Sequence, residues 1–153
     1  MAIKFDIRDR VGYRVQNLAN KMILWGARTY AQKFNVGVQE WRILSVLART
    51  GVGTAREVCE LTMMDKGNVS RAVGKLVCSG RIKEQPDKQD KRSSVLILTP
   101  KGVELYKRIK KVSDAREKKF WAALTAAERK ALPQILTKLD NVIEELLQNP
   151  EKV

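Results

Sequence analysis

Between Lys66 and Lys75 the chain carries polar and basic side chains that can donate hydrogen bonds and pair with negative charge. Val69, Val73 and Leu76 recur there at helical spacing, which predicts one buried stripe and leaves the polar side chains on the other faces of the helix. A basic hairpin is predicted directly after this helix. A polar and basic helix beside a basic hairpin is the arrangement of a winged helix-turn-helix, which holds duplex DNA with both parts.

Local signals define where this helix and the hairpin begin and end. Asp65 is expected to cap the helix, because a short side-chain acceptor there can bond a free backbone N–H. Gly80 suits the left-handed residue that ends a helix. Residues 81–85 and 94–98 are predicted to pair as two strands, and the tip between them, 87–92, carries five charges in six residues. The hairpin therefore forms a charged wing.

Apolar periodicity and capping residues predict that the rest of the chain is helical. Hydroxyl and carboxylate side chains form two capping boxes, Thr54 with Glu57 and Thr125 with Glu128. The predicted helices cover about residues 6–34, 38–49, 54–61 and 100–121, with a last helix after Thr125.

Prolines and glycines mark the boundaries of these helices. Thr99 suits the N-cap of a helix whose first residue is Pro100. Residues 51–53, with a glycine at each end, predict a turn. Pro133 lies within the last helix and should kink or restart it.

The first and last helices carry apolar seams that the compact DNA-binding part does not need. Part of each seam must serve an ordinary intramolecular core. Burying both helices together and against a second copy is the economical solution for a twofold dimer. The residues expected at that interface are Val11, Val15, Leu18, Leu132, Leu136, Leu139 and Ile143.

The charge of the chain is strongly positive and unevenly distributed. The formal net charge is +13, from 30 basic and 17 acidic residues. Residues 66–92 carry 8 basic and 3 acidic side chains, whereas residues 120–153 carry 4 basic and 5 acidic ones. Such an imbalance favours a polyanionic partner, either nucleic acid or an anionic membrane surface.

Several functional classes are excluded by residues that the sequence lacks. Histidine is absent, so neither a Ser-His-Asp or Cys-His nucleophile nor a Cys₂His₂ zinc site can form. Phosphate-binding glycine motifs are also missing. We therefore expect no enzymatic activity, no metal and no cofactor.

The sequence also indicates a reducing compartment. Cys59 and Cys78 are the two cysteines, of which Cys59 is expected to be packed and Cys78 more exposed. The N-terminus is charged and lacks the apolar segment of a signal peptide. Apolar runs are too short to span a bilayer, which needs about 20 residues. A cytoplasmic protein without a membrane partner is expected.

Over almost its whole length the chain resembles regulators of the multiple-antibiotic-resistance (MarR) family. The family pattern in the recognition helix is roughly Asp-Lys-Ser-Thr-Val-Thr-Arg, followed by Leu and Gly. Here it reads Asp65-Lys66-Gly67-Asn68-Val69-Ser70-Arg71, followed by Leu76 and Gly80. The wing pattern, Asp-x-x-Asp-x-Arg before Leu-Thr-x-x-Gly, is matched by Asp87, Asp90, Arg92, Leu98, Thr99 and Gly102. The chain departs from the family at Gly67 and Asn68, where Ser and Thr are usual.

This resemblance implies a mainly α (α+β) winged helix-turn-helix with long N- and C-terminal dimerisation helices and a two-stranded β wing. We expect a single domain, 1–153, with a DNA-binding lobe at 38–99 and a helical dimerisation lobe at 6–34 and 100–148. The implied function is sequence-specific regulation of transcription. A homodimer would bind a pseudo-palindromic operator, usually as a repressor that a small ligand or oxidation releases.

The resemblance also implies roles for individual residues. Ser70 and Arg71 can reach base edges, Arg most effectively as a bidentate donor to guanine. Asn68 is expected to bond adenine or phosphate. Arg92 resembles the wing-tip arginine that enters the minor groove, and Asp90 can hold its guanidinium. Phosphate contacts, which give affinity without sequence information, are expected chiefly from Lys66 and Lys75. The remaining basic side chains of the wing tip are Lys88 and Lys91.

Two further interpretations stay open at this point. Ligands of the family commonly enter the space between the dimer helices and the winged helix, where Trp25, Tyr30 and Trp41 could line a site or simply form core. The alternative function is a sequence-independent architectural DNA-binding protein, because phosphate contacts look alike in both.

Overall fold

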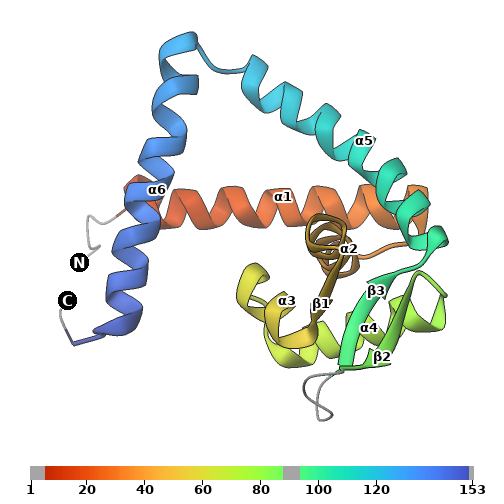
Figure 1. Ribbon diagram of the computed structural model, residues 1–153. Helices are drawn as coiled ribbons and strands as arrows, with labels where there is room; N and C mark the ends of the chain where they lie inside the picture. The colour runs from red at the N-terminus through yellow and green to blue at the C-terminus, as the bar shows by residue number, and fades with distance from the viewer. Residues whose placement is uncertain (1–5, 88–93, 152–153) are drawn as a thin grey trace. The chain divides into compact units, whose positions relative to one another are not determined.

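The computed structural model describes residues 6–87 and 94–151 and is mainly helical, with a small antiparallel sheet (Figure 1). This confirms the predicted fold class. Its elements are the 3₁₀ helix η1 (Ile7–Asp9), α1 (Val11–Phe34), α2 (Val38–Thr50), β1 (Val52–Thr54), α3 (Ala55–Thr62), α4 (Lys66–Cys78), β2 (Ile82–Pro86), β3 (Ser94–Leu98), α5 (Pro100–Ala122) and α6 (Ala126–Gln148).

The sheet contains the predicted hairpin and one strand that the sequence did not reveal. β2 and β3 pair antiparallel from Ile82 opposite Leu98 to Pro86 opposite Ser94. β1 lies on the other side of β3, which gives the strand order β1-β3-β2. The prediction of a plain turn at 51–53 was wrong, because Gly51, at φ +80°, turns the chain and the next three residues pair with β3. Three residues are too few to show the alternation that marks a strand.

The N-terminal helix is shorter than predicted. Asp6 caps η1 by accepting a hydrogen bond of 2.9 Å from the backbone N–H of Arg8. Arg10 is extended, at φ −81° and ψ 131°, and α1 begins only at Val11. At the other end of the chain α6 continues through Pro133 as one helix and does not restart there.

The structure confirms the residues predicted to cap the starts of α3, α5 and α6. The side chains of Thr54 and Thr125 accept from the backbone N–H groups three residues later, and both capping boxes are complete. The Thr99 hydroxyl accepts a 3.1 Å hydrogen bond from the Gly102 N–H at the start of α5.

The end of α4 follows the pattern that Gly80 predicts. Gly80 is left-handed, at φ +66°, and its N–H donates to the carbonyl of Val77. The next N–H, that of Arg81, donates to the carbonyl of Leu76. These two bonds form a Schellman motif, which satisfies carbonyls at the end of α4 and directs the chain into β2.

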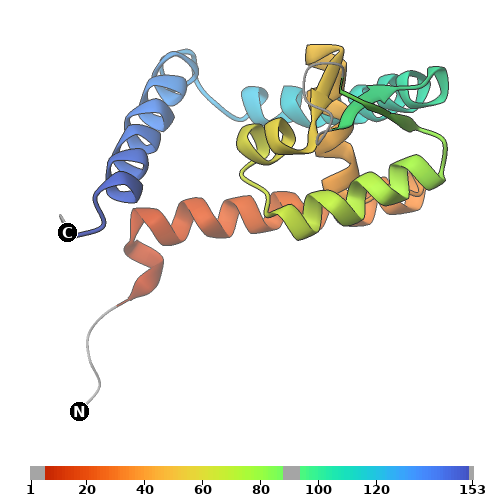
Figure 2. The same cartoon turned by 60° about the horizontal axis from the view of Figure 1, so that its bottom comes forward.

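The core lies between α2, α3, α4 and the sheet. α4 packs against both α2 and α3 (Figure 2). Because Val69, Val73 and Leu76 are all buried in this core, the apolar stripe of α4 faces inward. The largest side chains that are completely buried include Ile43, Leu44, Leu47, Leu76, Ile82, Leu96 and Ile109.

The chain divides into two compact units, Met1–Lys110 and Lys111–Val153, with the division inside α5. The first unit holds the sheet and the helices that support α4. In the second unit, α6 has no buried residue among those that the structure describes. The lobe boundaries inferred from the sequence stay a prediction.

Candidate nucleic-acid interface

α4 presents the predicted polar side chains on the faces opposite its buried stripe. Val69, Val73 and Leu76 are buried, as the periodicity predicts. Lys66, Ser70, Arg71 and Lys75 are exposed, and Asn68 is half-buried. One helix therefore displays hydrogen-bond donors and positive charges together, over about two and a half turns.

Asp65 organises the first turn of α4. Its Oδ1 accepts a 2.8 Å hydrogen bond from the backbone N–H of Asn68, which confirms the predicted N-cap. The hydrogen bond from this N–H is the main cause that lowers the pKa of Asp65 below its ordinary value of 3.8. Its Oδ2 accepts a second hydrogen bond, from Asn68 Nδ2. The amide of Asn68 is in turn bonded to Arg71, whose Nη2 donates to Asn68 Oδ1 at 2.7 Å.

Lys75 forms an ion pair with a buried glutamate, Glu40, that the sequence analysis did not identify. Glu40 of α2 is buried, and its Oε2 accepts a 2.7 Å hydrogen bond from the Gly37 N–H at the start of α2. Its Oε1 lies 3.7 Å from Lys75 Nζ. The spacing of three residues between Gly37 and Glu40 is that of a capping pair and could have indicated this role.

The base of the wing is fixed to the start of α5. The backbone N–H of Thr99 donates to the carbonyl oxygen of Arg81 at 3.1 Å, and its hydroxyl donates to the carbonyl oxygen of Gly80 at 2.7 Å, with the Arg81 oxygen 3.1 Å away. A Cβ at Gly102 would lie 1.9 Å from the same oxygen, so only glycine allows this close approach. Four predicted DNA-binding residues lie outside the described residues: Lys88, Asp90, Lys91 and Arg92.

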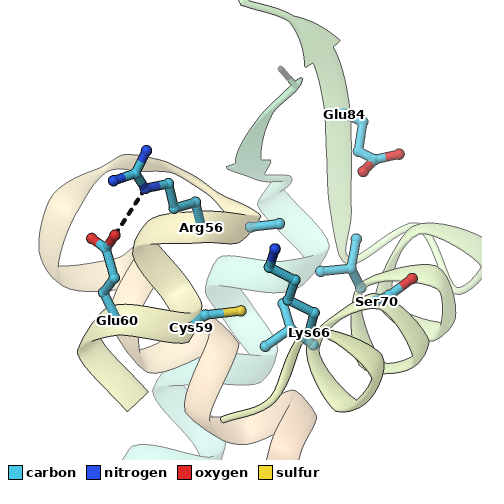
Figure 3. Close-up of a pocket in the computed structure, with 9 residues that line it drawn as sticks. Arg56, Cys59, Glu60, Lys66, Ser70 and Glu84 are labelled. Carbon is cyan, nitrogen blue, oxygen red and sulfur yellow. Dashed lines mark hydrogen bonds and ion pairs between the residues drawn. The ribbon is translucent and has the colours of Figure 1, made fainter. Parts of the chain in front are cut away.

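A groove of about 630 Å³ lies between α3, α4 and β2 (Figure 3). It adjoins the candidate DNA-binding surface, because Lys66 and Ser70 belong to both. The Arg56 and Glu60 side chains beside it form an ion pair at 2.9 Å. Cys59, expected to be packed, is half-buried and lines the groove, and Cys78 is exposed as expected. The other lining residues are Ala55, Val69, Val73 and Glu84.

The three aromatic residues proposed for a ligand site lie in one cluster. The ring centroids of Trp25 and Tyr30 are 5.7 Å apart, and those of Tyr30 and Trp41 are 5.9 Å apart. Tyr106 of α5 extends the cluster by stacking on Trp41 at 5.4 Å, a contact that sequence spacing could not predict. Tyr30 is 1% exposed, and its hydroxyl has no hydrogen-bond partner among the described residues.

The residues predicted for the dimer interface are largely exposed in the single chain. On α1, Val11 is 60% exposed, Leu18 is 58% exposed and Val15 is 47% exposed. On α6, Ile143 is 55% exposed, and Leu132 is half-buried. Leu136 and Leu139 are also exposed.

The described residues offer neither a metal-ion site nor a membrane-spanning helix. In the ranges 6–87 and 94–151, no three histidine, cysteine or acidic side chains gather where they could hold a metal ion. Within the same ranges, no helix has both the length and the apolar character needed to cross a membrane.

The fold and the α4 surface define a winged helix-turn-helix protein, and comparison with known proteins identifies its family. Residues 34–93 match the model of the MarR family. A MarR/EmrR-family transcriptional regulator from Acinetobacter sp. ADP1 is 33% identical, with a TM-score of 0.84 over 92% of this chain and 99% of that one. The chain belongs to the MarR family of transcriptional regulators.

Two more distant likenesses extend this comparison. The transcriptional activatory protein BadR of Rhodopseudomonas palustris is 26% identical over 102 residues, which cover 65% of this chain and 58% of BadR. The chain spans about three fifths of the length of the curated relatives it matches. A MarR mutant from E. coli, solved in complex with operator DNA, has the same fold, with a TM-score of 0.76 and 20% identity over 88% of this chain and 99% of that one.

Proposed function

We propose that the protein is a sequence-specific DNA-binding regulator that holds a pseudo-palindromic operator as a homodimer. The observation that carries this proposal is the exposed polar face of α4, supported from below by the buried Val69, Val73 and Leu76. A recognition helix needs such rigid support, because base readout depends on the position of a few side chains. The operator complex of the E. coli relative with the same fold supports the assignment.

In this proposal the residues of α4 divide into two roles. Ser70 and Arg71 face base edges in the major groove, where arginine can donate two hydrogen bonds to guanine. Lys66 and Lys75 contact phosphates, which set affinity and its dependence on salt. Asn68 is close enough to Arg71 to act with it, through the 2.7 Å hydrogen bond.

The wing is proposed to add a second contact to each half-site. Arg92 would enter the minor groove with Asp90 holding its guanidinium, and Lys88 and Lys91 would approach phosphates. The described part of the wing supports this role, since β2 and β3 pair over their full lengths beside α4. The hydrogen bonds from Thr99 to Gly80 and Arg81 hold the start of β2 against the end of β3.

A homodimer through α1 and α6 accounts for the apolar surface of the single chain. A helix as long as α6 obtains most of its stability from packing an amphipathic face. Among the described residues it has no buried one, although Leu139 and Ile143 lie on one seam. We propose that a second copy covers this seam together with the seam of α1.

A small-molecule effector is proposed to act at the aromatic cluster of Trp25, Tyr30, Trp41 and Tyr106. The cluster joins α1 and α2 of the first unit to the start of α5. The buried Tyr30 hydroxyl is a polar group that a ligand or a water could satisfy, since leaving it unpaired is unfavourable. Trp25 is 36% exposed and gives the cluster an open side.

We propose that the regulator is a repressor, that it has no enzymatic activity and that it acts in the cytoplasm. The family resemblance implies repression, whereas the relative from Rhodopseudomonas palustris is named as an activator. A reporter driven by the protein's own upstream DNA would measure the sign. Repression predicts higher expression without the regulator, and lower expression would identify an activator.

The alternative, a sequence-independent architectural DNA-binding protein, is tested by a mobility-shift titration. We expect the protein to bind its own upstream DNA at least about a thousandfold more tightly than scrambled DNA of equal length and composition. Equal affinity for both DNAs, with the same salt dependence, would favour the architectural function.

A further inference from the structure

The first turn of α4 holds the guanidinium of Arg71 in a chain of hydrogen bonds. Asp65 accepts from both the backbone N–H and the side-chain Nδ2 of Asn68. The Oδ1 of Asn68 accepts from Arg71 Nη2 at 2.7 Å. We propose that Asn68 is a positioning residue that aims Arg71 at its base, and that Gly67 provides the space in which the guanidinium lies. This inference rests on the proposed DNA-binding function.

Charge fixes the orientation of the Asn68 amide. Its Nδ2 donates a hydrogen bond to the Asp65 carboxylate, and its carbonyl oxygen accepts one from the Arg71 guanidinium. A flipped amide would place oxygen against carboxylate and N–H against guanidinium, so both hydrogen bonds would be lost. Neutral asparagine therefore links the negative Asp65 to the positive Arg71 in a single arrangement.

This arrangement argues against the expectation that Asn68 reads a base directly. Asparagine recognises adenine by presenting Oδ1 and Nδ2 to the same base edge. Here the two atoms bond two different residues, the N-cap Asp65 and Arg71 of α4. A contact to adenine through the same N–H and the same oxygen lone pair would compete with both bonds, whereas an aimed Arg71 keeps both of them.

Gly67 is part of the same arrangement. A Cβ at this position would lie 3.2 Å from Asp65 Oδ1 and 3.3 Å from Arg71 Nη1. Both distances are shorter than ordinary carbon–oxygen and carbon–nitrogen contacts, so a side chain at 67 would shift the guanidinium or the carboxylate by a few tenths of an ångström. The space left by Gly67 and the amide of Asn68 together place Arg71, at the two positions where the family usually has Ser and Thr.

The experiment compares base preference among variants on a site selected by the wild-type protein. Base preference is the ratio of affinities for that site and for copies with one base pair changed. Arg71→Ala should lower this ratio about tenfold at one position of each half-site. Asn68→Ala should lower it at the same position, by about threefold or more, without changing the salt dependence, because no charge is removed.

A double-mutant cycle separates positioning from direct contact. If Asn68 acts only through Arg71, adding Asn68→Ala to Arg71→Ala should cause no further loss of preference. Lys66→Ala is the control from the same turn, and it should weaken binding to all sites equally. A loss at a different base position for Asn68→Ala, or additive losses in the double variant, would overturn the positioning role.

Gly67→Ala gives an independent readout. Alanine is the better helix former by about 1 kcal/mol, so a purely structural role predicts a higher melting temperature and unchanged DNA preference. We expect the melting temperature to be maintained or raised while the preference at the Arg71 position falls. An unchanged preference in this variant would contradict the role of Gly67.

The outcomes also separate this inference from the proposed function. If the wild-type protein selects no sequence, or if Arg71→Ala leaves the preference intact, the assignment of α4 as the recognition helix fails. If Arg71→Ala loses the preference but Asn68→Ala and Gly67→Ala keep it, only the positioning device is refuted. Circular dichroism of each variant confirms that α4 is still folded.

Discussion

α4 and α6 are both amphipathic helices, yet of the two only α4 buries its apolar face within the described part of the chain. The apolar stripe of α4 is buried against α2 and α3, with Leu76 completely covered. The seam of α6 leaves Ile143 more than half exposed. Helical periodicity thus indicates which face of a helix is to be buried, but it does not indicate what covers that face. The apolar stripe of α4 is therefore covered within the chain, whereas we propose that a second copy covers the seams of α1 and α6.

The largest effect is expected from placing charge on the α6 seam. Leu139→Asp combined with Ile143→Asp should abolish dimerisation, because two carboxylates would be buried without partners. Analytical ultracentrifugation should then show a monomer at every accessible concentration. Operator affinity should fall with it, since each monomer holds only one half-site.

A matched control places the same charges on the opposite face of α6. Thr137→Asp combined with Asn141→Asp adds two carboxylates at exposed positions, and this variant should stay dimeric. If both double variants remain folded dimers that bind DNA, the α6 seam is not the interface.

Truncating one leucine in each helix should separate the two kinds of packing. Leu76→Ala should lower the free energy of unfolding by about 2–5 kcal/mol, and its effect should not depend on protein concentration. Leu139→Ala should have a smaller effect whose size depends on concentration, because association stabilises the folded state by mass action. Thermal unfolding over a hundredfold range of concentration measures both, and a concentration-independent loss for Leu139→Ala would place that residue in an intramolecular core.

Glycine substitutions test how the wing is attached. Gly102→Ala should lower the free energy of unfolding by about 1–3 kcal/mol, since its Cβ would overlap the carbonyl oxygen of Arg81. Gly74→Ala, with no atom within 4 Å of its Cβ, should instead gain about 1 kcal/mol from helix propensity. Chemical denaturation compares the two, and equal effects would refute the close approach at Gly102.

The smallest effect concerns the N-cap of α4 in acid. The hydrogen bond from the Asn68 N–H lowers the pKa of Asp65 in the folded protein. The charged carboxylate therefore stabilises the folded state at pH values above its ordinary pKa of 3.8. This contribution is lost as the pH falls through the lowered pKa. Asp65→Asn keeps a capping side chain that does not titrate. The difference in melting temperature between wild type and Asp65→Asn should therefore change below about pH 4, and a difference independent of pH would contradict the capping role.

Local chemistry allowed most of the fold to be predicted from the sequence. Asp65, Gly80 and Thr125 each act on backbone groups a few residues away, so their roles follow from spacing alone. Contacts between distant segments were not predictable, as β1 pairing with β3 and Tyr106 stacking on Trp41 both show.

In the candidate site too, local features could be predicted from the sequence, whereas contacts between distant segments could not. The exposed face of α4 was predicted by its period, and the hydrogen bonds through Asn68 lie within one turn but depend on side-chain geometry. The ion pair from Lys75 to Glu40 joins two helices and could not be read from either segment.

The most direct test of this account is the selection of bound sequences from random DNA by the wild-type protein. We predict enrichment of two half-sites related by a twofold axis, with centres about one helical turn, or 10 base pairs, apart or a multiple of that spacing. That result would report sequence specificity and the dimer at once. Recovery of sequences no different from the starting pool, or of a single half-site without symmetry, would contradict a dimeric operator-binding regulator.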